Sequence, residues 1–239
     1  MSVCTDFFVR LSIDLCGEKK MDKSAVMQKL SDIGAVITDS HIVYTSERHG
    51  NSYINKDALY MHTKETSQLC KLLADQYDAN EIDVVIGPII GGVVLSQWVA
   101  YHLNDKRKSG ETLSLYAEKE GEGENKKLVI KRGYDQYIPN KHVLVVEDVL
   151  TTGGSARKCI EAVRALGGKI VGLSALCNRG GIKPEDIGNA PIHALINITM
   201  DSWSEQECPM CKEKIPINIS VGKGKLFLRK HGTRTSQCN

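Results

Sequence analysis

The amino-acid sequence predicts an α/β fold in which helices cover both faces of a parallel, twisted sheet. From Ile82 onward, short apolar runs alternate with segments whose apolar residues recur at helical spacing. This alternation is typical of a parallel sheet that is buried on both faces. The runs expected to be strands are "IDVVIG", "LSLYAE", "HVLVVED", "KIVGLSAL" and "PIHALINIT".

Amphipathic segments precede and separate these strands. Residues 23–34 and 65–79 have helical spacing, and "GGVVLSQWVAYHL" follows the first strand as a further helix. Between the third and fourth strands, "SARKCIEAVRAL" places its apolar residues on one face and is ended by Gly167 and Gly168. Ligands of such sheets bind beyond the carboxyl ends of the strands, so chemistry is expected in the loops there.

Three parts are expected along the chain. Residues 1–64 form an N-terminal helix and a strand-and-loop segment, residues 65–200 form the α/β core, and residues 201–239 form a less periodic C-terminal extension. Within the core, residues 119–136 are charged and contain glycine, which favours a mobile loop or hairpin at the site end of the sheet.

Composition and charge argue against several classes of protein. The 239 residues carry 31 basic and 29 acidic side chains, a formal net charge of +2, so no global field favours nucleic acid or an anionic membrane. No apolar segment approaches the roughly 20 residues of a membrane span, and an Asp interrupts the N-terminal stretch where a signal peptide would be apolar. Most of the eight cysteines are scattered singly, as in reduced proteins. We therefore expect a cytoplasmic protein.

The stretch "VLVVEDVLTTGGSARK" combines two acids with a glycine-rich turn. Glu147 and Asp148 end an apolar strand, and residues 151–155 lead into a helix whose N-terminal N–H groups favour a phosphate. The carboxylates would repel that phosphate, so they must face hydroxyl groups or a divalent cation. A ribose 5-phosphate offers both features. A plain strand-to-helix connection capped by Ser155 would explain the turn but not the two acids.

"VVEDVLTTGGS" resembles the phosphoribosyl-pyrophosphate signature of the type I phosphoribosyltransferases. Over most of its length the chain is similar to the orotate phosphoribosyltransferases of that family. "YINKDALYMHT", "VVIGPIIGG", "LYAEKE", "KRGY" and "LCNRGG" occur in the same order and at approximately the same spacing, and "CPMCKEKIPI" is similar to a segment near the end of one subgroup. The resemblance implies the type I phosphoribosyltransferase fold, with a small hood formed by the N- and C-terminal parts beside the base site.

The resemblance also implies an activity. It points to a Mg²⁺-dependent enzyme of pyrimidine biosynthesis that transfers the 5-phosphoribosyl group of phosphoribosyl pyrophosphate to orotate, giving orotidine 5′-phosphate and pyrophosphate. Its partners would be small molecules rather than nucleic acid or membrane. A homodimer is implied, because in the family the loop that corresponds to residues 119–136 reaches the partner's active site. Mg²⁺ is expected on pyrophosphate and ribose oxygens, with Asp148 as a candidate protein ligand.

The resemblance implies a role for individual residues. Glu147, Asp148 and Lys119 are the expected catalytic residues, and the two acids would bind the ribose hydroxyls. The phosphates of the donor are expected at Gly91, Lys119, Arg132, Thr151, Thr152, Gly153, Gly154 and Ser155. The base is expected beside Tyr53, Lys56, Thr151 and Arg179. Without the resemblance, "GPIIGG" reads as a tight turn, the lysines of residues 119–136 as solvated charges, and Tyr53 and Lys56 as ordinary half-buried and surface residues.

Three positions depart from the orotate-enzyme pattern. Asn178 stands where an Asp usually precedes the arginine, Glu47 replaces a glycine, and Thr45 occupies a position where another branch has a lysine. Two alternatives therefore stay open: a phosphoribosyltransferase for another nucleobase, and a non-catalytic regulator that senses phosphoribosyl pyrophosphate.

The segment "CPMC" is a lone C-x-x-C pair. We expect Cys208 and Cys211 to form a local turn without zinc. The nearest candidates for two further ligands are His231 and Cys238, and their spacing is unusual for a zinc site.

Overall fold

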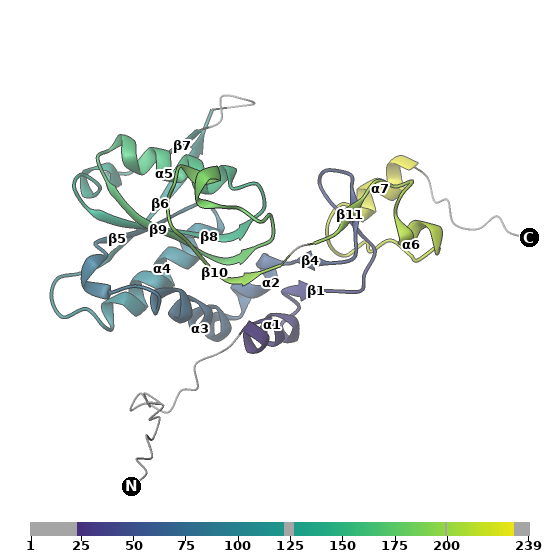
Figure 1. The fold of residues 1–239 in the computed structure, drawn as a ribbon, viewed down its shortest axis with the longest axis horizontal. Helices are drawn as coiled ribbons and strands as arrows, with labels where there is room; N and C mark the ends of the chain where they lie inside the picture. Colours follow the sequence, from purple (N-terminus) through teal and green to yellow (C-terminus); the bar gives the residue numbers. More distant parts are fainter. Residues whose placement is uncertain (1–22, 122–126, 199, 232–239) are drawn as a thin grey trace, which may run out of the picture.

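A six-stranded sheet forms the centre of the computed structural model, which describes residues 23–121, 127–198 and 200–231. Its strands lie in the order β10-β9-β8-β5-β6-β7 (Figure 1). Neighbouring strands are parallel except for β6 and β7, which are antiparallel. The strands are β5 (Val84–Pro88), β6 (Leu113–Glu120), β7 (Lys127–Val129), β8 (His142–Leu150), β9 (Lys169–Asn178) and β10 (Ile192–Asn197).

Helices cover both faces of this sheet. Adjacent residues of a strand point to opposite faces, so each strand contributes side chains to both layers. Val85 and Leu144 belong to a buried cluster with residues of α1 (Lys23–Asp32), α3 (Thr63–Ala74) and α4 (Gly91–Asn104). Val84 and Val143, their neighbours, pack on the other face with α5 (Gly154–Ala165). Figure 1 shows α3 and α4 on one side of the sheet and α5 on the other. The predicted two-faced sheet is therefore confirmed.

The winding of the chain reverses between β5 and β8. Helix α4 connects β5 to β6 on one side, whereas β8 lies on the other side of β5 and leads into α5 on the opposite face. The segments that leave the carboxyl ends of β5 and β8 therefore diverge. In open parallel sheets such a divergence forms the crevice in which ligands bind.

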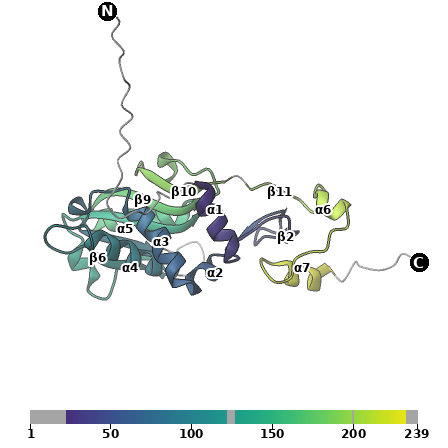
Figure 2. The same ribbon diagram turned by 90° about the horizontal axis from the view of Figure 1, so that it is seen from below.

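A smaller part, which we call the hood, consists of residues 36–54 and 202–231. Its central strand, β3, pairs with β2 on one edge and with β11 on the other. The N-terminal and C-terminal segments therefore share one three-stranded sheet. Figures 1 and 2 both place the hood beside the core, beyond α2 (Lys56–Met61). Its elements are β1 (Val36–Ile37), β2 (Ile42–Val43), β3 (His49–Gly50), β4 (Tyr53–Ile54), β11 (Ser202–Trp203), α6 (Pro209–Lys212) and α7 (Gly224–His231).

The helices and strands predicted from the sequence are confirmed, with shifted ends. Helix α3 ends at Ala74. Short 3₁₀ turns lie after α3 at Ala79–Glu81, after β7 at Tyr134–Tyr137 and after β9 at Pro184–Ile187. The charged segment at 119–136 contains the hairpin of β6 and β7, although residues 122–126, Lys126 among them, lie outside the described residues. The division of the chain at residues 64 and 200 stays a prediction. Within the described ranges, no helix combines the length and apolar character needed to cross a membrane.

Gly87 allows β5 and α4 to approach each other beside the crevice. A Cβ at this position would lie 2.5 Å from the Gly92 Cα and 2.7 Å from the Val146 carbonyl oxygen, and both are backbone atoms that cannot turn away. Gly87→Ala should therefore lower the free energy of unfolding by about 1–3 kcal/mol, the usual cost of overpacking. Urea unfolding measures this loss. Gly154→Ala is the control, because its Cβ would meet nothing closer than 3.5 Å; equal losses in both variants would contradict the packing argument.

Candidate functional site

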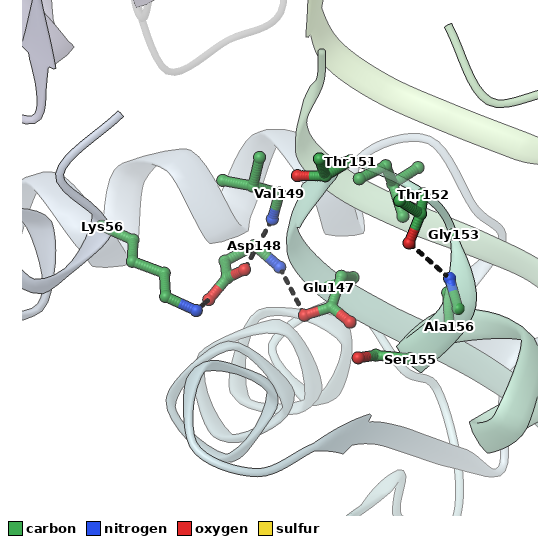
Figure 3. Close-up of a pocket in the computed structure, with 11 residues that line it drawn as sticks. Lys56, Glu147, Asp148, Val149, Thr151, Thr152, Gly153, Ser155 and Ala156 are labelled. Atoms are coloured by element: carbon green, nitrogen blue, oxygen red, sulfur yellow. Dashed lines mark hydrogen bonds and ion pairs between the residues drawn. The ribbon is translucent and has the colours of Figure 1, made fainter. Parts of the chain in front are cut away.

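The two predicted acids lie at the carboxyl end of β8, beside the crevice. Glu147 is 7% exposed and Asp148 is 3% exposed. The carboxylates leave the strand in different directions: Asp148 points toward Lys56, and Glu147 points toward the start of α5 (Figure 3). The Asp148 N–H donates to Glu147 Oε1 at 3.2 Å, and the Val149 N–H donates to Asp148 Oδ1 at 2.6 Å. The strand end thus holds two carboxylates in fixed and different orientations.

Asp148 receives its other partners from helix α2. Lys56 Nζ lies 3.0 Å from Asp148 Oδ2, and the Tyr60 hydroxyl donates to the same oxygen at 2.6 Å. These two residues are four positions apart, so they lie on the same face of α2. Gly91, the first residue of α4, is also close, because a Cβ there would clash with Asp148 Oδ2 and the Tyr60 hydroxyl. Tyr60 was not predicted from the sequence, although its i+4 spacing from Lys56 was a signal available there.

Burial decides the electrostatics of the pair. Desolvation, followed by the neighbouring negative charge of Asp148, raises the pKa of Glu147 well above the usual range of a glutamate. Burial by itself lowers the pKa of Lys56, but the carboxylates of Asp148 and Glu147 outweigh it and hold that pKa above its ordinary value. Burial, and then the charge of Asp148, raise the pKa of Tyr60, so its hydroxyl stays a donor. The Asp148 carboxylate is therefore paired with the Lys56 amine and the Tyr60 hydroxyl. The raised pKa of Glu147 instead favours its protonated form.

The glycine-rich turn forms the other wall of the site. A cavity of about 170 Å³ is lined by Lys56 and by residues 147–156. Gly153 has φ 72°, a left-handed conformation that favours glycine, and it turns the chain into the 12-residue helix α5. The first turn of α5 contains no acidic residue, so its N–H groups present an uncompensated positive end to the cavity. The predicted residues Thr151, Thr152, Gly153, Gly154 and Ser155 all line this space.

The loop after β9 packs against the same turn. The Asn178 amide nitrogen donates to the Ile182 carbonyl oxygen, and the Ile182 N–H donates to Asn178 Oδ1, both at 2.9 Å. A Cβ at Gly180 would overlap the Thr151 carbonyl oxygen, so this loop approaches the turn as closely as glycine permits. The side chain at 178 thus closes the loop, which gives Asn178 a structural role at a position where the resembled enzymes usually have Asp.

The structure places Arg179 between the core and the hood, not in the cavity wall. Its guanidinium carbon lies 5.2 Å from the centroid of the Tyr44 ring, a cation–π contact. The Tyr44 hydroxyl donates to the Ser52 carbonyl oxygen at 2.6 Å. Tyr53, another predicted base residue, lies on β4 paired with β1 and likewise does not line the cavity. Of the residues predicted for the donor, the cavity wall therefore contains Glu147, Asp148 and residues 151–155 but not Gly91, Lys119 or Arg132. Of those predicted for the base, it contains only Lys56 and Thr151.

Glu47 is paired with the C-terminal helix of the hood. Lys230 Nζ donates to Glu47 Oε1 at 2.6 Å, and this hydrogen bond, followed by the charge of Lys230, lowers the pKa of Glu47. Glu47 has φ 60°, the left-handed conformation that glycine adopts freely, and Thr45 is an exposed residue of the same turn. The position therefore has the backbone geometry of the expected glycine, while the carboxylate is neutralised by α7.

The cations of the β6–β7 hairpin are directed at glutamates of the same hairpin. Lys127 Nζ lies 3.2 Å from Glu120, Lys131 pairs with that same glutamate, and Arg132 pairs with Glu118. Lys119 faces Leu128 across the hairpin and is exposed, and among the described residues it has no ion-pair partner. Neither Lys119 nor Arg132 lines the cavity of this chain.

The cysteine pair has different neighbours from those considered in the sequence. Cys208 Sγ and Cys211 Sγ each lie 3.6 Å from His41 Nε2, and Cys211 Sγ lies 3.3 Å from His49 Nδ1. His231 stacks instead on Phe227, with ring centroids 4.3 Å apart, and Cys238 lies outside the described residues. No local signal could have identified the two histidines, because they precede the cysteines by more than 150 positions.

Comparison with known proteins finds similarity to phosphoribosyltransferases. Residues 56–208 match the family model described as the phosphoribosyl transferase domain. The chain is 34% identical over 197 residues to the orotate phosphoribosyltransferase of Thermoanaerobacter sp. (strain X514), covering 82% of this chain and 96% of that protein. It is 35% identical over 206 residues to the orotate phosphoribosyltransferase of Pelotomaculum thermopropionicum, covering 86% and 100%.

Two solved structures share the fold. The orotate phosphoribosyltransferase of Aeropyrum pernix superposes with a TM-score of 0.59 at 24% identity, covering 72% of this chain and 93% of that one. The adenine phosphoribosyltransferase of Thermoanaerobacter pseudethanolicus superposes with a TM-score of 0.55 at 18% identity, covering 72% and 99%. Enzymes named for two different bases therefore share this architecture.

Glu147 should make the stability of the protein depend on pH. Because its pKa is raised in the folded state, the folded protein binds this proton more tightly than the unfolded chain, and stability is lost as the pH rises from the ordinary to the raised pKa. Glu147→Gln removes the titrating group. The variant should gain stability relative to the wild type between about pH 5 and pH 9, by on the order of a few kcal/mol.

Urea unfolding at the two pH values measures this difference. Glu161→Gln, at an exposed position on α5, is the matched control and should show little change with pH. If the difference between Glu147→Gln and the wild type were the same at both pH values, Glu147 would not be the buried, proton-binding group described above.

Proposed function

Because the chain belongs to the phosphoribosyl transferase domain family, we propose that it is an orotate phosphoribosyltransferase. It transfers the 5-phosphoribosyl group of phosphoribosyl pyrophosphate to orotate, giving orotidine 5′-phosphate and pyrophosphate for pyrimidine biosynthesis. The observation that carries the proposal is the cavity itself, a space of about 170 Å³ lined by two buried carboxylates and by the N-terminus of α5. Identity of 34–35% to orotate phosphoribosyltransferases over most of both chains supports the choice of base.

Each wall of the cavity has a separate task in this reaction. The carboxylates of Glu147 and Asp148 accept hydrogen bonds from the ribose hydroxyls, and the N–H groups at the start of α5 bind the 5-phosphate. Lys56 and Tyr60 hold Asp148 in one orientation, at 3.0 Å and 2.6 Å from its Oδ2. Fixed groups of this kind position the sugar and stabilise the positive charge that develops at its C1 atom when pyrophosphate leaves.

Mg²⁺ fits the chemistry of this site, because carboxylate oxygens are ligands that this ion prefers. Asp148 is the protein ligand that we propose, and substrate oxygens would complete the coordination, since two adjacent carboxylates supply too few ligands alone. When bound, the ion would neutralise the charge of the leaving pyrophosphate.

The contacts around Arg179 and Glu47 support orotate over an adenine-like base. Arg179 keeps a planar guanidinium between the core and the hood, where it can donate to the oxygens of a pyrimidine carboxylate. Glu47, which would repel an anionic base, is paired instead with Lys230. The two departures at 47 and 178 thus have structural explanations that leave an anionic base acceptable.

We also propose a homodimer in the cytoplasm. Lys119 is exposed, has no ion-pair partner among the described residues and does not line the cavity of its own chain, so its amine is available to a second copy. Among the described residues, five cysteines form no disulfide, which agrees with a reducing compartment.

A base-specificity assay tests the proposed activity. With Mg²⁺ and phosphoribosyl pyrophosphate, the protein should consume orotate, and Asp148→Asn should lower kcat/KM by on the order of 100-fold, as expected for loss of a group that stabilises the transition state. The assay follows consumption of orotate and, in parallel, of adenine, guanine and uracil. Turnover of a purine alone would show that the protein is a phosphoribosyltransferase for another base. Binding of phosphoribosyl pyrophosphate without turnover of any base would show that it is a non-catalytic regulator.

Mixing of two inactive variants tests the dimer. Lys119→Ala leaves the acidic pair intact, and Asp148→Asn leaves the hairpin intact. If Lys119 acts in the partner's site, a mixed dimer has one complete site, and an equal mixture should recover up to about one quarter of the wild-type activity. Activity that stays at the level of the separate variants would place Lys119 and Asp148 in the same chain's site or remove Lys119 from catalysis.

A further inference from the structure

Four metal-binding side chains meet inside the hood, far from the cavity of the proposed reaction. His41, His49, Cys208 and Cys211 each present one donor atom, and these atoms all lie within 4.8 Å of one another. Three of the four side chains are buried, with exposed fractions of 2% for His41 and 0% for His49 and Cys208. They come from three separate places: the start of β2, strand β3, and the turn that begins α6.

The distances between the donors match a tetrahedral zinc site. With Zn–N near 2.0–2.1 Å and Zn–S near 2.3 Å, a tetrahedron separates its donor atoms by about 3.3–3.8 Å. Three of the four sulfur–nitrogen pairs lie at 3.6, 3.6 and 3.3 Å, and all the donor atoms lie within 4.8 Å of one another. The two ring nitrogens, His41 Nε2 and His49 Nδ1, are closer, at 2.8 Å, and a central cation would move them apart by about half an ångström.

The second nitrogen of each histidine orients its ring. His41 Nδ1 donates to the Ile215 carbonyl oxygen at 2.7 Å, which leaves the Nε2 lone pair directed at the cysteines. Such a hydrogen bond is the usual support of a metal-binding imidazole. His49 Nε2 is buried and has no hydrogen-bond partner among the described residues, and Phe227 meets this ring edge-on at 5.0 Å. The polar contacts of the His49 ring are therefore those of Nδ1, which faces His41 and Cys211 of the cluster.

The hood contains little else that could hold it together. Its buried apolar side chains, apart from the cluster itself, are Val36, Ile42, Val43, Tyr44, Met210 and Phe227, and only Val36 belongs to one of the two large clusters of the core. A part of this size buries too little apolar surface to be stable alone, and small folds of this kind commonly depend on a metal or on disulfides. The centre that a larger fold would fill with aliphatic side chains is occupied here by two imidazoles and two thiols.

We propose that Cys208, Cys211, His41 and His49 bind one structural zinc ion that joins the N-terminal and C-terminal segments of the hood. This site takes no direct part in the proposed transferase reaction, because none of its four residues lines the cavity. Two thiolates and two imidazoles are the ligand set that zinc prefers, and four protein ligands leave no open position for a substrate. It replaces the metal-free turn expected from the sequence, because the missing ligands come from the histidines of the N-terminal segment instead of His231 and Cys238.

The zinc content of the full-length protein tests this site. Protein purified under reducing conditions, supplied with zinc and desalted, should contain one zinc ion per chain by mass spectrometry of the metal. Cys208→Ser and His49→Gln should each lose most of it. His231→Gln is the matched control: it changes a histidine of the same hood that stacks on Phe227 outside the cluster, and it should retain the metal.

Cobalt substitution reports on the geometry even if a variant fails to fold. The wild-type protein loaded with Co²⁺ in place of zinc should show the intense visible bands of tetrahedral coordination and a thiolate-to-cobalt charge-transfer band. Chelation of the zinc should lower the thermal midpoint of the wild type and leave that of Cys208→Ser unchanged. Wild-type protein without bound zinc after loading, with octahedral cobalt spectra, or with a Cys208–Cys211 disulfide under reducing conditions would overturn the proposal.

Discussion

Two adjacent carboxylates are buried at the end of β8, and their removal from water must be offset by groups from several other elements. Helix α2 supplies the amine of Lys56 and the hydroxyl of Tyr60, and α4 begins with Gly91 because a side chain there would clash with Asp148. The start of α5 adds the positive end of a helix on the other side. The site therefore depends on where β8 ends relative to three helices, and the topology of the sheet determines that position.

The two carboxylates differ in their electrostatic surroundings, and this difference matters for the ligand proposed for the site. Asp148 is held by a cation and a hydroxyl, whereas burial drives Glu147 toward its protonated form. A sugar that donates hydrogen bonds would favour ionised Glu147, so binding and deprotonation are coupled in the proposed enzyme. The helix N-terminus is free to bind an anion because no acidic side chain lies in its first turn. Negative carboxylates and the positive end of a helix thus lie within ten residues of each other in the same cavity wall.

The hood has a different physical basis from that of the core. The core is stabilised by two large apolar clusters on either side of the sheet, but the hood centres on histidine and cysteine side chains. It nevertheless contacts the site region, because Tyr44 of the hood lies against the guanidinium of Arg179. A metal that orders β2 and β3 would therefore also help to fix Arg179 at the base end of the proposed reaction. Stability of the hood and recognition of the base are linked through this one contact.

Local sequence was sufficient for the elements of the core and for most of the residues that line the cavity at the end of β8. Apolar periodicity identified the strands and helices, because burial on one or two faces requires apolar residues at regular intervals in the sequence. Glu147, Asp148 and residues 151–155 were also identifiable, because a strand end, a turn and a helix start are consecutive in the chain. Lys56 was named only through the resemblance, and Tyr60 not at all, because their contact with Asp148 spans about ninety positions.

Residue order alone therefore predicts the α/β class and the glycine-rich turn before α5, because both depend on residues that are neighbours in the chain. Only the tertiary structure decided that Glu47 pairs with Lys230, that Asn178 closes its own loop, and that His41 and His49 meet the cysteine pair. The physical reason is that these contacts arise when segments distant in the sequence pack together, and residue order alone carries no record of which distant side chains become neighbours.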